Sequence, residues 1–104
     1  MNGLLFTAGV GPIDPESGKV VGATIEEQTH QVMKNLGVIL SAAGFTYSDV
    51  VKATVHLQNL ERDFAGFNQV YQHYFSDSLP VRTTVGSNLN KILVEIDFIA
   101  GQAQ

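Results

Sequence analysis

Residues 79–100, L-P-V-R-T-T-V-G-S-N-L-N-K-I-L-V-E-I-D-F-I-A, form the stretch around which the rest of the chain is organised. Residues 81–89 follow a proline that suits the start of a strand, and they are rich in β-branched side chains. Residues 92–100 alternate between two faces, as a strand does. Residues 87–91 have the composition of a hairpin loop. The pattern therefore predicts two strands joined as a hairpin.

Two charged residues stand in this otherwise apolar stretch. Arg82 lies in a β-branched run, and Glu95 lies among aliphatic and aromatic residues. If the two strands pair, both side chains approach the same end of the sheet. One fixed cation and one proton-handling carboxylate facing a cleft would suit a small anionic substrate. The alternative is a structural cross-strand salt bridge, which is the commoner reason for charges in such strands.

Composition limits the class of protein. The chain has 104 residues, enough for one domain over residues 1–104, with 44% hydrophobic residues, 15% charged residues and a net charge of −4. The absence of cysteine excludes a disulfide framework, a thiol nucleophile and a cysteine zinc site. Only six Lys and Arg residues are present, which makes a nucleic-acid partner unlikely. No membrane-length apolar run or signal peptide is visible, so we expect a cytoplasmic protein. The low charge fraction of a small domain leaves apolar surface to be covered, so we also expect a homo-oligomer.

The remaining elements predict an α+β fold. Residues 4–8 form a short apolar strand, and Asn2-Gly3 before it is a turn signal that has no partner strand. Thr24 and Glu27 form a capping box for a helix over residues 25–43. Residues 50–57 alternate as a strand, and Asn59 should cap a second helix that carries an aromatic stripe. This order favours a mixed sheet with both helices on one face, leaving the other face for subunit packing.

No cofactor or metal motif is present. The glycine-rich segment 9–19 has the wrong spacing for a phosphate loop, and Val20 stands where that motif needs Ser or Thr. His30, His56 and His73 fall on separate predicted elements without ligand spacing. The aromatic stripe of the second helix is more often core than a cofactor site. We therefore expect no bound cofactor and no metal.

Six segments in order resemble the YjgF/RidA family of enamine/imine deaminases, which is also labelled endoribonuclease L-PSP. They are L-F-T-A-G-V-G-P-I-D-P-E-S-G-K-V-V-G, T-I-E-E-Q-T-H-Q-V-M-K-N-L, D-V-V-K-A-T-V-H-L, F-N-Q-V-Y-Q-H-Y-F, P-V-R-T-T-V and V-E-I-D-F-I-A. The resemblance covers nearly the whole chain. It implies a chorismate-mutase-like fold and a homotrimer with a central barrel and three clefts between subunits.

The resemblance also implies roles for the two charged residues. Arg82 matches the arginine that grips the substrate carboxylate, and Glu95 matches the glutamate that positions the attacking water. The implied reaction is hydrolysis of a 2-imino acid, such as the tautomer of 2-aminoacrylate, to a 2-keto acid and ammonia. No cofactor is implied.

Four further positions match the lining of the family's cleft. Thr84 stands where the family often has a cysteine whose backbone faces the ligand. Thr7-Ala8-Gly9 matches a T-S-G motif, with Ala8 in place of the usual serine. Asn68 matches a helix asparagine near the cleft. Substrate contacts are therefore expected from Thr84, Gly9, Ala8 and Asn68, in addition to Arg82.

Two departures from the family pattern leave alternatives open. The strand with the G-P-Y-S-Q motif that usually comes first is absent from this sequence, and the segment between Arg82 and Glu95 is about two residues shorter than usual. Either change is compatible with a trimer that binds small 2-keto or amino acids without turnover. A ribonuclease, suggested by the family label, is opposed by the acidic composition.

Overall fold

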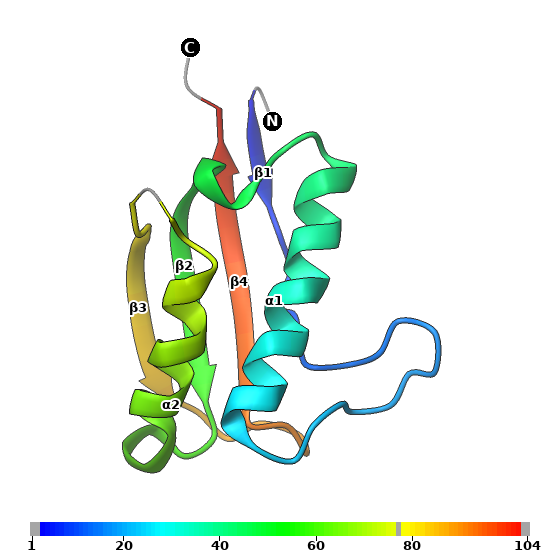
Figure 1. Ribbon diagram of the computed structural model, residues 1–104, viewed down its shortest axis with the longest axis vertical. Helices are drawn as coiled ribbons and strands as arrows, with labels where there is room; N and C mark the ends of the chain where they lie inside the picture. The colour runs from blue at the N-terminus through cyan, green and yellow to red at the C-terminus, as the bar shows by residue number, and fades with distance from the viewer. Residues whose placement is uncertain (1–2, 77, 103–104) are drawn as a thin grey trace.

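The computed structural model describes residues 3–76 and 78–102, which form a four-stranded sheet with two helices packed on one face (Figure 1). In chain order the elements are β1 (Leu4–Phe6), α1 (Ile25–Ala42), a 3-10 turn (Tyr47–Asp49), β2 (Val50–Leu57), α2 (Leu60–His73), β3 (Val81–Gly86) and β4 (Val94–Gly101). The predicted α+β class, with a mixed sheet and both helices on one face, is confirmed.

The sheet has the strand order β1-β4-β2-β3. β2 and β3 are parallel and are joined by α2, whereas β4 is antiparallel to both of its neighbours, β1 and β2. A parallel pair joined by a helix is a β-α-β crossover, so α2 must lie across the sheet. β4 and β2 are therefore the two central strands, and β1 and β3 form the edges.

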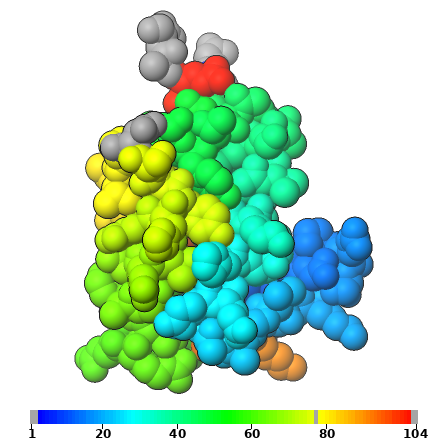
Figure 2. Space-filling model, viewed as in Figure 1, coloured from blue at the N-terminus to red at the C-terminus, as the bar shows by residue number. Residues whose placement is uncertain are grey.

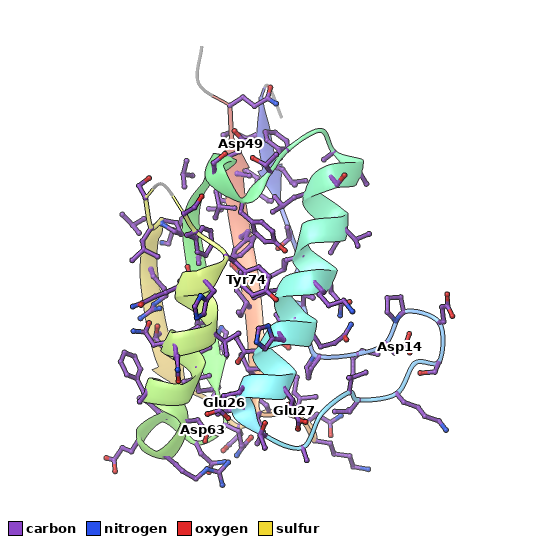
Figure 3. The ribbon with its side chains drawn as sticks, in the orientation of Figure 1. Asp14, Glu26, Glu27, Asp49, Asp63 and Tyr74 are labelled. Carbon is purple, nitrogen blue, oxygen red and sulfur yellow. The ribbon has the colours of Figure 1, made fainter. Side chains whose placement is uncertain are left out.

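Helix α1 begins where its sequence predicts and ends at Ala42, one residue earlier than predicted. The hydroxyl of Thr24 accepts a 3.1 Å hydrogen bond from the Glu27 N–H, and the Glu27 carboxylate accepts from the Thr24 N–H at 3.1 Å. At the other end Gly44 has φ 84, a conformation that glycine adopts without strain. Figure 3 shows Glu26 and Glu27 at the start of α1, at the same end of the molecule as Asp63 near the start of α2.

The core lies between the helices and one face of the central strands. The alternation predicted for β4 is confirmed, because its even-numbered residues are buried and its odd-numbered residues are only half-buried. The fully buried side chains of the two central strands meet those of the two helices. The largest of them are Tyr71, Phe67, Phe98, Met33, Leu36, Leu40, Leu57 and Ile96.

Several predicted boundaries need correction. β3 ends at Gly86 rather than at residue 89, and β4 starts at Val94 rather than at residue 92. β1 ends at Phe6 rather than at residue 8. Asn59 does occupy the N-cap position of α2, but its side chain makes no capping hydrogen bond. Asn2 lies outside the described residues.

The predicted hairpin between residues 81–89 and 92–100 is wrong, because β2 lies between β3 and β4. The crossover through α2 places β3 on one edge of β2, and β4 pairs with the opposite edge. Residues 87–93 connect β3 to β4, and seven residues are more than the two to five of a typical hairpin loop. This connection is long enough to run past the end of β2, from β3 on one side to β4 on the other.

The second face of the sheet carries exposed apolar side chains. Phe6 on β1 is 54% exposed and Val81 on β3 is 68% exposed, and both lie on the face away from the helices. The long segment of residues 9–22 projects from the side of the molecule (Figure 2). The side chain of Asn35 on α1 anchors the first part of this segment by donating hydrogen bonds to the carbonyls of Gly11 and Ile13. Neither α1 nor α2 has the length and hydrophobicity that crossing a bilayer requires.

Candidate functional site

Arg82 lies on the edge strand β3 and reaches toward α2, on the helix face of the sheet. Its Nη1 donates a 2.7 Å hydrogen bond to Oδ1 of Asn68. A guanidinium has five N–H donors in a planar fork, so this bond leaves donors for a ligand. Within residues 3–76 and 78–102 the only ion pair joins Arg62 and Asp63, so Arg82 has no carboxylate partner there. The predicted salt bridge between Arg82 and Glu95 is therefore not formed within one chain.

Three aromatic rings of α2 surround the Arg82 guanidinium. Its central carbon lies 4.9 Å from the ring centre of Tyr71, 5.4 Å from that of Phe67 and 5.7 Å from that of Phe64. Cation–π contacts of this kind fix the orientation of a guanidinium and reduce its contact with water. The stripe that the sequence assigns to the core therefore also holds the cation. The sequence showed only the spacing of these aromatic residues along the helix, not their contact with Arg82.

A small pocket opens beside Arg82, with a volume of about 280 Å³. It is lined by Asn68, Tyr71, Gln72, Leu79, Pro80 and Arg82. The hydroxyls of Tyr71 and Thr84 are buried on this side of the sheet without a hydrogen-bond partner among the described residues. Burial raises the pKa of Tyr71 to about 12, while the Arg82 cation acts in the opposite direction. The phenol is therefore a neutral donor at physiological pH.

Glu95 lies on β4 and points to the other face of the sheet. Phe6 pairs with Ile99, and Val10 pairs with Ile96. The two pairs are four residues apart on the N-terminal segment but only three residues apart on β4. This mismatch is a β-bulge at Ala8-Gly9. The bulge carries the Gly9 backbone against the Glu95 carboxylate, where a Cβ atom would come within 2.6 Å of Oε2. Glycine is the residue that allows this approach.

Arg82 and Glu95 do not share a pocket within one chain. Arg82 is opposite Ala53 on β2, and Glu95 is opposite His56, three residues further along the same strand. At about 3.3 Å per residue and about 4.8 Å between strands, their Cα atoms are roughly 14 Å apart. The two side chains also leave opposite faces of the sheet. The prediction that adjacent strands bring them together is wrong for a single copy.

The six predicted site residues therefore fall into two groups. Arg82, Asn68 and Thr84 lie on the helix side of the sheet at the β3 edge, and the first two are in direct contact. Glu95, Gly9 and Ala8 lie at β4 and the bulge beside it. Sequence reasoning missed His56, whose Nδ1 lies 2.7 Å from Oγ of Ser87 on the same face as Glu95. The alternation of β2 could have placed His56 on that face.

A larger hollow of about 870 Å³ lies along α1, away from both groups. It is an open groove between the helix and the loop that carries Asp14 and Pro15. Both of its side-chain amides are already engaged: Asn35 donates to the carbonyls of Gly11 and Ile13, and Gln31 donates to Oδ1 of Asn35. We therefore assign the candidate site to the Arg82 and Glu95 groups rather than to this groove.

The chain is thus a small α+β protein with a mixed four-stranded sheet and, among the described residues, an arginine beside α2 that has no carboxylate partner. Residues 1–102 match the family described as Endoribonuclease L-PSP. The chain belongs to this family, the YjgF/RidA family. The resemblance seen in the sequence is thus confirmed.

Relatives in several organisms support this membership. A RutC family protein of Pyrococcus horikoshii is 48% identical over 98 residues, which are 92% of this chain and 77% of that protein. The mouse protein named 2-iminobutanoate/2-iminopropanoate deaminase is 40% identical over 94% of this chain and 73% of its own length. The chloroplast Reactive Intermediate Deaminase A of Arabidopsis thaliana is 47% identical over 80% of this chain and 44% of that protein.

Solved structures share the fold. The YjgF gene product of E. coli superposes with a TM-score of 0.90 at 33% identity, covering 97% of this chain and 82% of that one. E. coli TdcF with bound serine superposes with a TM-score of 0.92 at 31% identity, covering 99% of this chain and 84% of that one. The two-layer arrangement seen here is therefore that of YjgF-type proteins.

Proposed function

We propose that this protein hydrolyses small 2-imino acids, such as the tautomer of 2-aminoacrylate, to 2-keto acids and ammonia. The observation that carries the proposal is the Arg82 guanidinium, which is held by Asn68 and three rings but has no carboxylate partner among the described residues. A guanidinium in this state is suited to a planar carboxylate, which it can bind through two parallel hydrogen bonds. Relatives named as reactive-intermediate and imine deaminases support the reaction.

The complete site would form between copies of the chain. In one copy Arg82 and Glu95 leave opposite faces of the sheet, so a pocket that contains both needs a second copy. The exposed apolar face that includes Phe6 and Val81 would be covered by the same association. We propose a homotrimer with this face turned inward as a central barrel and one cleft at each of the three seams. A closed ring with identical contacts is the usual outcome of such a head-to-tail interface.

The chemistry assigns one task to each group. Arg82 would bind the substrate carboxylate and hold the C=N carbon in place. Glu95 would take a proton from water as the oxygen bonds to that carbon, and this proton would pass to the imine nitrogen. The hydroxyl proton of the resulting carbinolamine then moves by way of Glu95 to the amino nitrogen, the C–N bond breaks with its electron pair on nitrogen, and the carbonyl forms. The products are ammonia and the 2-keto acid.

The test is an assay of imine hydrolysis with an imine generated in solution by an amino-acid oxidase. Release of ammonia and keto acid would be measured for the wild-type protein and for Arg82→Ala, Arg82→Lys and Glu95→Gln. We expect wild-type turnover above the spontaneous rate and none above it in Arg82→Ala, because losing a buried charge contact typically costs about 2–5 kcal/mol. Arg82→Lys keeps the charge without the planar fork and should retain weak activity. Full activity in Arg82→Ala would remove the assignment.

A second candidate is a trimer that binds a small 2-keto or amino acid without turnover. The solved structure of TdcF with bound serine favours binding of this class of ligand in the family. In that case ligand would raise the unfolding temperature of the wild-type protein but not of Arg82→Ala, and no ammonia would be released. Activity on RNA that survived Arg82→Ala combined with Glu95→Ala would belong to a contaminant rather than to this site.

A further inference from the structure

His56 and Ser87 form a hydrogen-bonded pair on the open face of the sheet. His56 is near the end of β2, and Ser87 directly follows β3. The ring Nδ1 and the serine Oγ are 2.7 Å apart. The backbone holds Ser87 in place as well, because its N–H donates to the carbonyl of Leu57 at 2.9 Å. Both residues are half-buried, so the ring has a fixed orientation rather than a free one.

The same histidine is the direct cross-strand partner of Glu95. The register of β2 and β4 pairs His56 with Glu95, and both side chains point away from the helices. Side chains in this relationship have Cβ atoms about 4.5–5.5 Å apart. Among the described residues no direct hydrogen bond or ion pair joins the two, so a proton would pass between them through a bridging water. The Glu95 carboxylate therefore has the Gly9 backbone on one side and an oriented imidazole on the other.

The surroundings of the ring contain few other charges. On β2 itself Lys52 and Thr54 share the open face, and on β4 Glu95 and Asp97 share it. The neighbouring position of β3 is Val85, which is apolar. Glu95 is the carboxylate paired with the ring, so proton exchange between these two groups is the shortest route on this face.

We propose that His56, positioned by Ser87, exchanges protons with Glu95 during imine hydrolysis. The inference rests on the proposed function. Conversion of an imine and water to a ketone and ammonia moves two protons from the water oxygen to nitrogen, one at addition and one when ammonia leaves. A single carboxylate holds one proton at a time. At addition Glu95 takes the first proton from water, and the ring Nε2 holds it until it passes through Glu95 or water to the imine nitrogen. When ammonia leaves, the hydroxyl proton follows the same route to the departing nitrogen, so Glu95 and His56 both end in their starting states.

The role of His56 is that of a positioning and proton-exchanging residue that acts through Glu95, not of a group that contacts the substrate. Ser87 sets which ring nitrogen faces Glu95, because its hydroxyl occupies Nδ1. The part assigned to the serine in this arrangement is to orient the ring. The chemical class of substrate stays that of small 2-imino acids.

The experiment compares kcat and KM as functions of pH for the wild-type protein, His56→Gln, His56→Phe and Ser87→Ala. Glutamine can keep a hydrogen bond to Ser87 but cannot carry a proton, and phenylalanine keeps a flat ring of similar size. We expect kcat to fall about 100-fold in both His56 variants with KM nearly unchanged, at the lower end of what a positioned acid–base group contributes. Ser87→Ala should lower kcat about two- to tenfold, the effect of one net hydrogen bond.

The pH profile separates this role from a structural one. The kcat profile of the two His56 variants should differ in shape from that of the wild type, and added imidazole should restore part of the rate of a His56→Ala variant. Thr54→Val, on the same face of the same strand, is the matched control and should keep both kcat and the profile. Size-exclusion chromatography checks that every variant assembles as the wild type does.

The outcomes are distinguishable. Wild-type turnover together with an unchanged kcat profile in His56→Gln overturns the role of His56 and leaves the proposed function standing. No wild-type turnover removes the proposed function and this inference with it. If His56→Phe fails to fold, His56→Gln alone decides.

Discussion

Arg82 and Glu95 point to opposite faces of the same sheet, with β2 between their strands. Each side chain has its own support within the chain: Asn68 and the α2 rings hold the guanidinium, and the Gly9 backbone lies against the carboxylate. Neither support brings the two charges together. An enzymatic site that uses both residues therefore has to be shared between copies, and this requirement can be tested without a structure of the assembly.

The first prediction concerns mixed assemblies. Arg82→Ala and Glu95→Gln should each be inactive alone, but a 1:1 mixture that is unfolded and refolded together should recover activity. In a ring where each cleft takes Arg82 from one copy and Glu95 from the next, about a quarter of the clefts are intact after random mixing. The measurement is ammonia release per total protein, compared with each variant refolded alone. Zero recovery from a mixture that assembles normally would mean that each site lies within one copy.

The second prediction concerns Asn68, which accepts the 2.7 Å hydrogen bond from Arg82. Asn68→Ala frees the guanidinium to move, so KM should rise about tenfold, since a hydrogen bond to a charged group is worth about 1.5–3 kcal/mol. Asn68→Asp should raise KM further, because the new carboxylate competes with the substrate for the same fork. Turnover at saturating substrate should change little in Asn68→Ala.

Gln69→Ala is the matched control for these variants, because Gln69 is the exposed neighbour of Asn68 on α2. Steady-state kinetics of the three variants give the comparison. Equal KM values in the wild type, Asn68→Ala and Asn68→Asp would show that Arg82 does not bind substrate through the face that Asn68 orients.

Local signals in the sequence predicted where the helices and strands lie better than they predicted which strands pair. The capping box of Thr24 and Glu27 and the alternation of residues 50–57 involve neighbouring residues, so α1 and β2 could be placed directly. The neighbour of β3 depends instead on the crossover through α2, which a composition-based hairpin prediction ignores. The order strand, helix, strand was the available signal, because a connecting helix favours a parallel pair.

The site was harder to predict than the fold because it depends on register. Arg82 and Glu95 were recognised as charges in an apolar stretch and the family resemblance gave them roles, but their faces follow from the pairing of each strand with β2. The same register makes His56 the partner of Glu95, which spacing along the chain does not reveal. The α2 stripe was visible as periodicity, yet its contact with Arg82 requires the parallel pairing of β2 and β3.

The third prediction concerns Gly9. A Cβ atom at this position would lie 2.6 Å from Oε2 of Glu95, so Gly9→Ala must displace the carboxylate. The end of a glutamate side chain can move at little cost, and the fold should therefore keep its unfolding midpoint. Activity should fall at least about tenfold, because a displacement of about 1 Å in a catalytic group has effects of this size or larger. Urea unfolding and kcat measured on the same sample separate the two effects, and an unchanged kcat would exclude Glu95 from the chemistry.

The fourth prediction concerns the acid stability of α1. The backbone N–H groups of Ala23 and Thr24, with the Thr24 hydroxyl, hold the pKa of Glu27 below its ordinary value of 4.5. A carboxyl whose pKa is lower in the folded state stabilises that state above its unfolded pKa, and this stabilisation is lost as the pH falls through the folded pKa. The free energy of unfolding of the wild type should therefore exceed that of Glu27→Gln at pH 7, and the difference should shrink below pH 4.5.

Urea unfolding at pH 7, 5, 4 and 3 measures this difference. Glu61→Gln is the control, because Glu61 is also acidic and in the first turn of its helix but lies outside the capping box. At pH 7 the free energy of unfolding of Glu61→Gln should differ less from that of the wild type than the value for Glu27→Gln does. Thr24→Ala should lower the free energy of unfolding by about 1 kcal/mol at pH 7, since it removes the hydroxyl that accepts the Glu27 N–H. Imine hydrolysis should be unaffected in all three variants, because among the described residues none of the three side chains hydrogen-bonds to Arg82 or Glu95. A difference between Glu27→Gln and the wild type that does not change with pH would contradict the assigned role of the carboxylate.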